Sequence, residues 1–259
     1  MCKLCKYNNY WFIKRLIKLR KKFRLCIKDC KDIDNIPCMP KLFLLSIVNC
    51  HNIQIISNLI NLQTLYIFKA NAIINMYNLP NLQLLKLSEC NSIRNITNLY
   101  KLCIVDVDYC NKLVRINNLP LLKKLDIQNC PKLIILNNMK SLLVLKIENC
   151  NRLVNIYHFK ELKELRLINC HSIIDIGNLD KLQILSIFKC NSLEIIPSLA
   201  SLEALEINKC QKIKNIYEMT NLKELFISKC INILDISLCN QKEIKEYLSK
   251  ELIINKTIL

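Results

Sequence analysis

The chain has 259 residues, of which 52% are hydrophobic, and it carries 16 cysteines, a single glycine and a formal net charge of +17. One glycine excludes a glycine-rich phosphate-binding loop and gives no sign of a flexible linker between domains. No stretch of 18 apolar residues occurs, so the sequence predicts no helix that spans a membrane.

The amino-terminal segment is strongly basic, with nine lysines or arginines and no acid in residues 1–24. Within residues 1–20, Phe12, Leu16 and Leu19 recur at helical spacing. We predict a basic capping helix here, because a repeat protein would otherwise expose its terminal core. The segment could instead bind a membrane surface, a nucleic acid or a partner. Its basic residues interrupt the apolar stretch too early for a secretory signal.

Residues 21–240 repeat every 20 residues, and residue 21 is taken as position 1 of the first repeat. Leucine or isoleucine recurs at positions 2, 5, 7, 13, 16 and 19, and cysteine at position 10, where Ala70 is the one exception. The cysteines of this column are Cys30, Cys50, Cys90, Cys110, Cys130, Cys150, Cys170, Cys190, Cys210 and Cys230. We predict one domain of about eleven repeats.

Each repeat contains one alternating segment, in which Leu185 and Ile187 point inward while Ser186 and Phe188 point outward. This period of two predicts a short strand that stacks in parallel with its counterparts. The apolar spacing of three that follows favours a 3₁₀ turn or a short irregular helix. Asparagines at positions 11 and 18 tolerate left-handed backbone and replace glycine. The position 10 thiol is expected to satisfy turn backbone groups, so the turn at Ala70 should be looser.

This pattern resembles the leucine-rich-repeat superfamily in a short, cysteine-bearing form. The resemblance implies an α/β solenoid, a horseshoe with a parallel concave β-sheet and a short 3₁₀ or irregular convex side, and we expect helical caps at both ends. It also implies that the concave sheet binds another protein. The bias towards lysine, asparagine and isoleucine is similar to that of repeat proteins from large DNA viruses, such as entomopoxviruses, or AT-rich microbes. A viral or microbial protein would meet its partner in the host cytoplasm or nucleus.

The carboxyl-terminal segment, residues 241–259, departs from the repeat. Ile244, Tyr247, Leu248 and Leu252 fall on one face of a helix with 3.6 residues per turn. We therefore predict a carboxyl-terminal capping helix.

Few residues form a pattern that would carry chemistry. Cys2, Cys5, Cys26 and Cys30 have a spacing close to that of a four-thiolate zinc site, but the repeat and chance explain it, so we predict no metal and no cofactor. The cysteines are expected to be reduced structural thiols in a cytoplasmic protein. The three histidines, His51, His158 and His171, lie at turn positions and too far apart to share a site. We predict that the chain is not an enzyme and is a monomer.

The informative residues are those on the outward side of the strands, at positions 4, 6 and 8, which the repeat leaves variable. Exposed aromatic and aliphatic groups on a sheet are typical of contact sites, and an acidic centre argues against nucleic acid on this face. We therefore predict a non-enzymatic protein-binding scaffold, with nucleic-acid or membrane association through the basic amino terminus as the alternative. The candidate protein-binding residues are Tyr66, Phe68, Asp106, Asp108, Asp126, Glu148, Ile168, Phe188 and Phe226.

Overall fold

The chain forms a parallel β-solenoid of about ten turns of about 20 residues each, as seen in a computed structural model. The structure describes residues 16, 18, 20–156, 158–216, 219–233, 235–236 and 245–248. It divides into two compact units, Met1–Ser141 and Leu142–Leu259, and each unit is described by itself.

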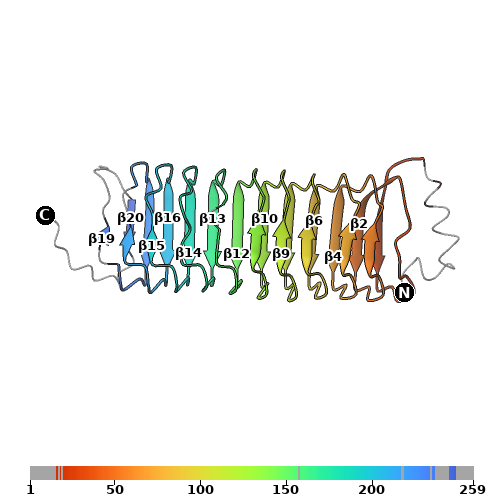
Figure 1. The fold of residues 1–259 in the computed structure, drawn as a ribbon, viewed down its shortest axis with the longest axis horizontal. Helices are drawn as coiled ribbons and strands as arrows, with labels where there is room; N and C mark the ends of the chain where they lie inside the picture. Colours follow the sequence, from red (N-terminus) through yellow and green to blue (C-terminus); the bar gives the residue numbers. More distant parts are fainter. Residues whose placement is uncertain are drawn as a thin grey trace. The chain divides into compact units, whose positions relative to one another are not determined.

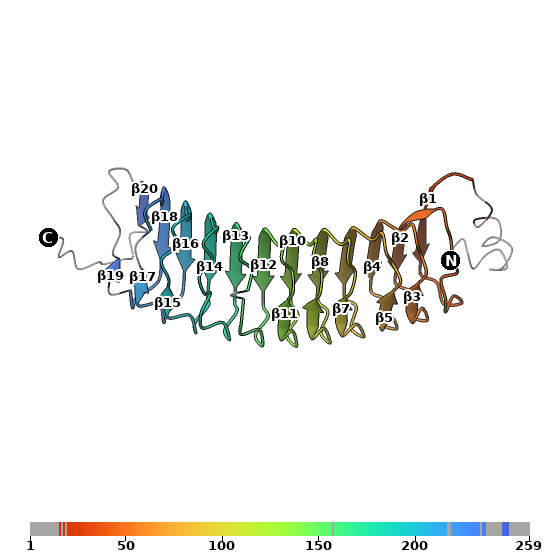
Figure 2. The same cartoon turned by 45° about the horizontal axis from the view of Figure 1, so that its top comes forward.

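The first unit contains a sheet of long parallel strands in the order β1-β2-β4-β6-β8-β10. These strands are β1 (Phe23–Lys28), β2 (Leu42–Val48), β4 (Thr64–Phe68), β6 (Leu84–Ser88), β8 (Ile104–Asp108) and β10 (Lys124–Gln128). A second set of short parallel strands consists of β3 (Ile55–Ser57), β5 (Asn75–Tyr77), β7 (Asn95–Thr97), β9 (Arg115–Asn117) and β11 (Ile135–Asn137). Figure 2 separates β4 and β8 of the long set from β5 and β7 of the short set.

The second unit repeats this arrangement in the order β12-β13-β14-β16-β18-β20, and Figure 1 shows β13, β14 and β16 as successive strands. Its long strands are β12 (Val144–Glu148), β13 (Glu164–Ile168), β14 (Ile184–Phe188), β16 (Ala204–Asn208), β18 (Glu224–Ser228) and β20 (Lys245–Leu248). Its short strands have two residues each: β15 (Ile195–Ile196), β17 (Asn215–Ile216) and β19 (Asp235–Ile236).

The long strands confirm the alternation predicted from the sequence. In β10, Leu125 and Ile127 are fully buried, whereas Asp126 and Gln128 are partly exposed. The parallel register joins Leu125 to Val105 and Asp126 to Asp106, so equal positions of successive repeats lie side by side. Inward positions therefore form continuous apolar columns, which is how a solenoid buries its core.

Turns, rather than a helix, explain the apolar spacing of three. The Leu122 amide donates to the Leu119 carbonyl at 3.2 Å, and the Leu133 amide donates to the Cys130 carbonyl at 3.1 Å. Each is a single i→i+3 turn, and the chain then extends into the long strand β10 after the first turn and into the short strand β11 after the second. Of the two predicted alternatives, the i→i+3 turns fit the 3₁₀ turn, and no short irregular helix occurs on this side in the described residues.

The predicted caps are only partly within the described residues. Residues 245–248, which we assigned to the carboxyl-terminal helix, form β20 and pair in parallel with β18. The free edge of a sheet offers unpaired amide and carbonyl groups, and a strand satisfies them where a helix does not. The rest of 241–259, and the predicted helix of residues 1–20 apart from isolated positions, lie outside the described residues.

Asparagine serves two separate purposes in the repeat. At position 18 of the first unit it adopts positive φ, as predicted, with 59° at Asn98 and 60° at Asn118. At position 11 it instead bridges repeats, since the Asn71 Oδ1 accepts the Asn91 amide at 2.9 Å and the Asn91 Oδ1 accepts the Asn111 amide at 3.0 Å. The position 18 asparagines therefore provide the left-handed turn conformation, and the position 11 side chains accept backbone amides that the turn would otherwise leave without a partner.

Candidate functional site

The outward side of the long strands, called the long-sheet face below, consists of positions 4, 6 and 8 of each repeat. Apart from Ser228, which is buried, the described side chains at these positions are half-buried or exposed, whereas the inward positions of the same strands are buried. The face is therefore a set of variable side chains on a uniform apolar support. Each unit has its own hollow on this face.

The hollow of the first unit has a volume of about 290 Å³ and brings together aromatic and acidic residues predicted from the sequence. The register places Tyr66, Lys86 and Asp106 on adjacent strands. Two residues further along the same three strands, the register places Phe68, Ser88 and Asp108 side by side. Its described lining is Ser46, Ile47, Val48, Tyr66, Ile67, Phe68, Lys86, Leu87, Ser88, Asp106 and Asp108.

Lys86 separates the aromatic and acidic sides of this hollow, a role that the sequence did not indicate. Its Nζ lies 2.8 Å from the Asp106 Oδ2. The hydrogen bond and the negative charge of Asp106 raise the pKa of Lys86 above its usual value. The acidic patch is therefore partly neutralised on the side that faces Tyr66.

The other two carboxylates among the candidate residues of this unit, Asp108 and Asp126, accept amide hydrogen bonds. Asp126 Oδ1 accepts the Gln128 side chain at 3.2 Å, and Asp108 Oδ1 accepts the Asn129 side chain at 2.9 Å. Charge-assisted bonds of this kind orient a carboxylate and leave its second oxygen available to a ligand. Asp106, Asp108 and Asp126 thus form an ordered acidic cluster on β8 and β10.

In the second unit, Ile168 and Phe188 lie side by side in register, as the sequence suggested. The Arg166 guanidinium lies 5.3 Å from the centre of the Phe188 ring, which fits a cation–π contact. Glu148 at the end of β12 is the register partner of Ile168, whereas Phe226 lies on β18, at position 6 of its repeat. Three of the candidate residues of this unit, Glu148, Ile168 and Phe188, therefore form one row across β12, β13 and β14, and Phe226 lies apart from them.

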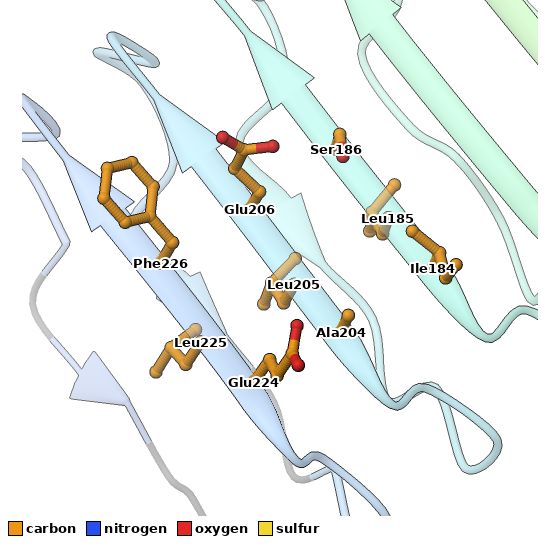
Figure 3. A pocket seen from close by; sticks show the side chains of 9 residues that line it. All are labelled: Ile184, Leu185, Ser186, Ala204, Leu205, Glu206, Glu224, Leu225 and Phe226. Carbon is orange, nitrogen blue, oxygen red and sulfur yellow. The ribbon is translucent and has the colours of Figure 1, made fainter. Parts of the chain in front are cut away.

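Phe226 belongs instead to a hollow of about 490 Å³ across β14, β16 and β18, shown in Figure 3. Its described lining is Ile184, Leu185, Ser186, Ala204, Leu205, Glu206, Glu224, Leu225 and Phe226. Ser186 and Ala204 have short side chains, so the face is hollowed between Ile184, Glu206 and Phe226. Apart from Phe226, sequence reasoning missed this lining, because a small residue becomes informative only when its neighbours on the sheet are known.

The cysteine column was considered as a chemical site and has the geometry of a structural element. The thiols of Cys130 and Cys190 donate to the carbonyls of Gln128 and Phe188 at 3.2 and 3.4 Å. Both cysteines are fully buried, so they lack the exposure that a reactive thiol needs. The position 10 thiol therefore satisfies a carbonyl at the end of the long strand. Ala70 is also fully buried, and the amide of Ile73 still donates to its carbonyl at 3.3 Å, so this bond shows no looser turn.

The zinc-like spacing does not form a cluster that the structure can describe. Cys26 is exposed on the long-sheet face, Cys30 is buried, and Cys2 and Cys5 lie outside the described residues. Within the described ranges, no group of three or more histidine, cysteine or acidic side chains could hold a metal ion. In the same ranges no helix is long and apolar enough to cross a membrane.

No protein-family model matches the chain, and no curated protein matches it.

Proposed function

We propose that the chain is a non-enzymatic scaffold of the leucine-rich-repeat type, which binds a protein partner through its long-sheet face. The supporting observation is that each unit has a hollow on this face with an aromatic wall, Tyr66 and Phe68 in one and Phe226 in the other. Aromatic side chains beside a hollow are the usual anchors of protein interfaces because they bury a large apolar area at a small entropic cost.

The proposal is tested by capturing partners with the full chain and with two paired variants. Tyr66→Ser with Phe226→Ser removes an anchor from each hollow. Tyr77→Ser with Ile174→Ser is the matched control, because these side chains are 51% and 60% exposed and lie outside the long strands. We expect the first pair to lose partners that the control pair retains. Identical partner sets for all three proteins would reject the long-sheet face as the binding surface.

Association with nucleic acid or a membrane surface through residues 1–20 remains the competing proposal, supported by the basic charge of that segment. Binding of this kind weakens steeply with added salt, because it depends on the release of counterions. A partner that is lost at high salt and after deletion of residues 1–20, but unaffected by the Tyr66 and Phe226 changes, would favour this alternative.

We also propose that the protein works in a reducing compartment, as a cytoplasm provides. Buried position 10 thiols such as Cys130 and Cys190 donate hydrogen bonds to carbonyls, and a disulfide would remove these donors. The mass of the intact, non-reduced protein tests this. A mass lower than that of the fully reduced chain, from hydrogens lost to disulfides, would contradict the proposal.

A further inference from the structure

The hollow of the second unit differs from that of the first in the state of its carboxylates. Glu206 and Glu224 both line it, and neither makes an ion pair or hydrogen bond with any side chain that the structure describes, a set that does not include the side chain of Lys245. Elsewhere on the same face Asp106 is paired with Lys86 at 2.8 Å and Glu164 with Lys146 at 3.0 Å. Two unpaired carboxylates in one hollow are unusual in a chain with a net charge of +17.

The remaining lining of the hollow suits the aliphatic part of a long cationic side chain. Ala204 and Ser186 leave space in the middle, and Ile184 and Phe226 form apolar walls. Figure 3 shows the Glu206 carboxylate between Phe226 and Ser186, and the Glu224 side chain on the same side as Ala204. None of the described lining residues is basic, and Lys245, the register partner of Glu224 on β20, is the nearest cation in the sheet register whose effect has to be tested.

We infer that this hollow recognises a lysine or arginine side chain of the protein partner. The inference rests on the proposed function of the long-sheet face, and it names the kind of partner side chain that the second unit binds. The cation lies between Glu206 and Glu224, its methylene groups pack over Ala204, and the Phe226 ring adds a cation–π contact. The net positive charge of the chain disfavours basic ligands on most of its surface, so such binding needs a local acidic site.

The test is selection from a random-heptapeptide display library with the full chain, followed by affinity measurement on one selected synthetic peptide. We expect the selected peptides to share a lysine or arginine beside apolar residues. Replacing that arginine by citrulline, or that lysine by norleucine, removes the charge and should weaken binding about tenfold, since one charge-assisted hydrogen bond has about that effect. Glu206→Gln with Glu224→Gln should weaken it by a similar factor.

The control variant, Glu161→Gln with Glu203→Gln, removes the same charge from carboxylates already paired with Lys181 and Lys223. It should change affinity less than twofold. Lys245 faces Glu224 in the strand register, so Lys245→Gln is also made, and it should not weaken binding. Equal losses in the control and test variants, or weaker binding by Lys245→Gln, would overturn cation recognition.

The two proposals fail in different ways. Selected peptides without a common cation, whose binding depends on Phe226→Ser but not on the glutamate variant, overturn this inference and leave the long-sheet face as the binding surface. Absence of any enriched peptide, or peptides insensitive to both the glutamate variant and Phe226→Ser, overturns the inference and counts against the proposed function.

Discussion

Five successive repeats, those that contain Asn58, Asn78, Asn98, Asn118 and Asn138, have left-handed backbone at both of their corners, but the two corners differ in the residues that they accept. Position 9, which follows the long strand, has φ values of 52° at Lys69, 53° at Glu89 and 49° at Tyr109. Position 18, which follows the short strand, has positive φ at asparagines such as Asn98 and Asn118. Left-handed backbone is unfavourable for lysine, glutamate and tyrosine, and asparagine tolerates it.

The difference follows from the hydrogen bonds on either side of the corner. The Glu89 amide donates to the Asp108 carbonyl at 3.0 Å, and the Tyr109 amide donates to the Gln128 carbonyl at 3.2 Å. The Cys130 thiol reaches that same Gln128 carbonyl. These bonds extend the ladder of the long sheet through position 9, and they hold the corner whatever its side chain is.

The corner after the short strand is held by fewer hydrogen bonds, and its backbone conformation depends on the residue type. In the second unit the corner of the Gly177 repeat, which has no short strand, has positive φ one position earlier, with 66° at Gly177, and not at Asn178. Ser198, which follows the two-residue strand β15, has no positive φ either. The Gly177 amide donates to the Asp175 side chain at 2.8 Å. The hydrogen bonds of the long sheet thus determine the backbone conformation at position 9, whereas the residue type determines it at the corner after the short strand.

Alkaline pH should produce the largest loss of stability, because it deprotonates position 10 thiols, which lie beside the corner after the long strand, more readily in the unfolded chain than in the folded one. Burial raises the pKa of Cys130 from 9.0 to about 12. As the pH rises above 9, the thiol loses its proton in the unfolded chain but keeps it in the folded one, so stability falls until about pH 12. Between pH 8 and pH 10, Cys130 alone should lower the free energy of unfolding by about 1 kcal/mol.

Cys110 and Cys190 act in the same direction, whereas hydrogen bonds with the neighbouring thiols lower the pKa of Cys90 and Cys230, which act in the opposite direction. A hydrogen bond with the neighbouring thiol, Cys90 or Cys170, and then burial raise the pKa of Cys110 and Cys190. Urea unfolding at a series of pH values measures the total loss. Cys130→Ala should make the loss smaller, and an unchanged pH dependence in this variant would contradict the assignment.

Valine at position 18 should distinguish the short-strand corners of the two units. Asn118→Val places a β-branched residue at φ 60° and removes the 2.6 Å hydrogen bond from the Asn118 Nδ2 to the Asn98 Oδ1. We expect a loss of about 2 kcal/mol in the free energy of unfolding. Asn178→Val, at a residue without positive φ, should cost less than about 0.5 kcal/mol. Equal losses in urea unfolding would mean that the two corners have the same requirement.

The contrast between the corners also explains how much of the fold the sequence predicts. Leu125 and Ile127 repeat with a period of two over a whole strand, so the long sheet and its inward columns follow directly from the pattern. The short strands have two or three residues, and the turns beside them produce a spacing of three that resembles a tight helix. The strand at 245–248 depends on an open sheet edge, which the helical spacing of its apolar residues does not show.

The candidate site was predictable only at the level of single residues. Tyr66, Asp106 and Phe226 could be placed on the outward face because their positions in the repeat determine the side of the strand. Their partners depend on register: Lys86 neutralises Asp106, and Ala204 with its short side chain opens the hollow beside Phe226. Contacts between repeats therefore determine which of the variable residues form a surface.

Asparagine at position 9 should stabilise the chain slightly, since the long sheet already holds this corner. Tyr109 has φ 49° and is 51% exposed, so its replacement loses little packing. Tyr109→Asn removes part of the cost of left-handed backbone and should raise the free energy of unfolding by about 0.5–1 kcal/mol. Urea unfolding beside Tyr100→Asn, an equally exposed tyrosine without positive φ, separates the backbone effect from loss of the ring. A gain of the same size in both variants would contradict the assignment of the gain to the backbone conformation of residue 109.

The smallest effect should come from restoring the missing cysteine of the column. Ala70 is fully buried, and its repeat has the same long strand and left-handed Lys69 as the others. A thiol in Ala70→Cys would donate to the Phe68 carbonyl as Cys90 donates to the Ser88 carbonyl at 3.4 Å. Because S–H is a weak donor and the corner is already held by the sheet, we expect a gain of only about 0.5 kcal/mol in urea unfolding. A gain of several times this size would show that the thiols, rather than the sheet hydrogen bonds, hold the corner, and a loss would show that the site at Ala70 has closed around the smaller side chain.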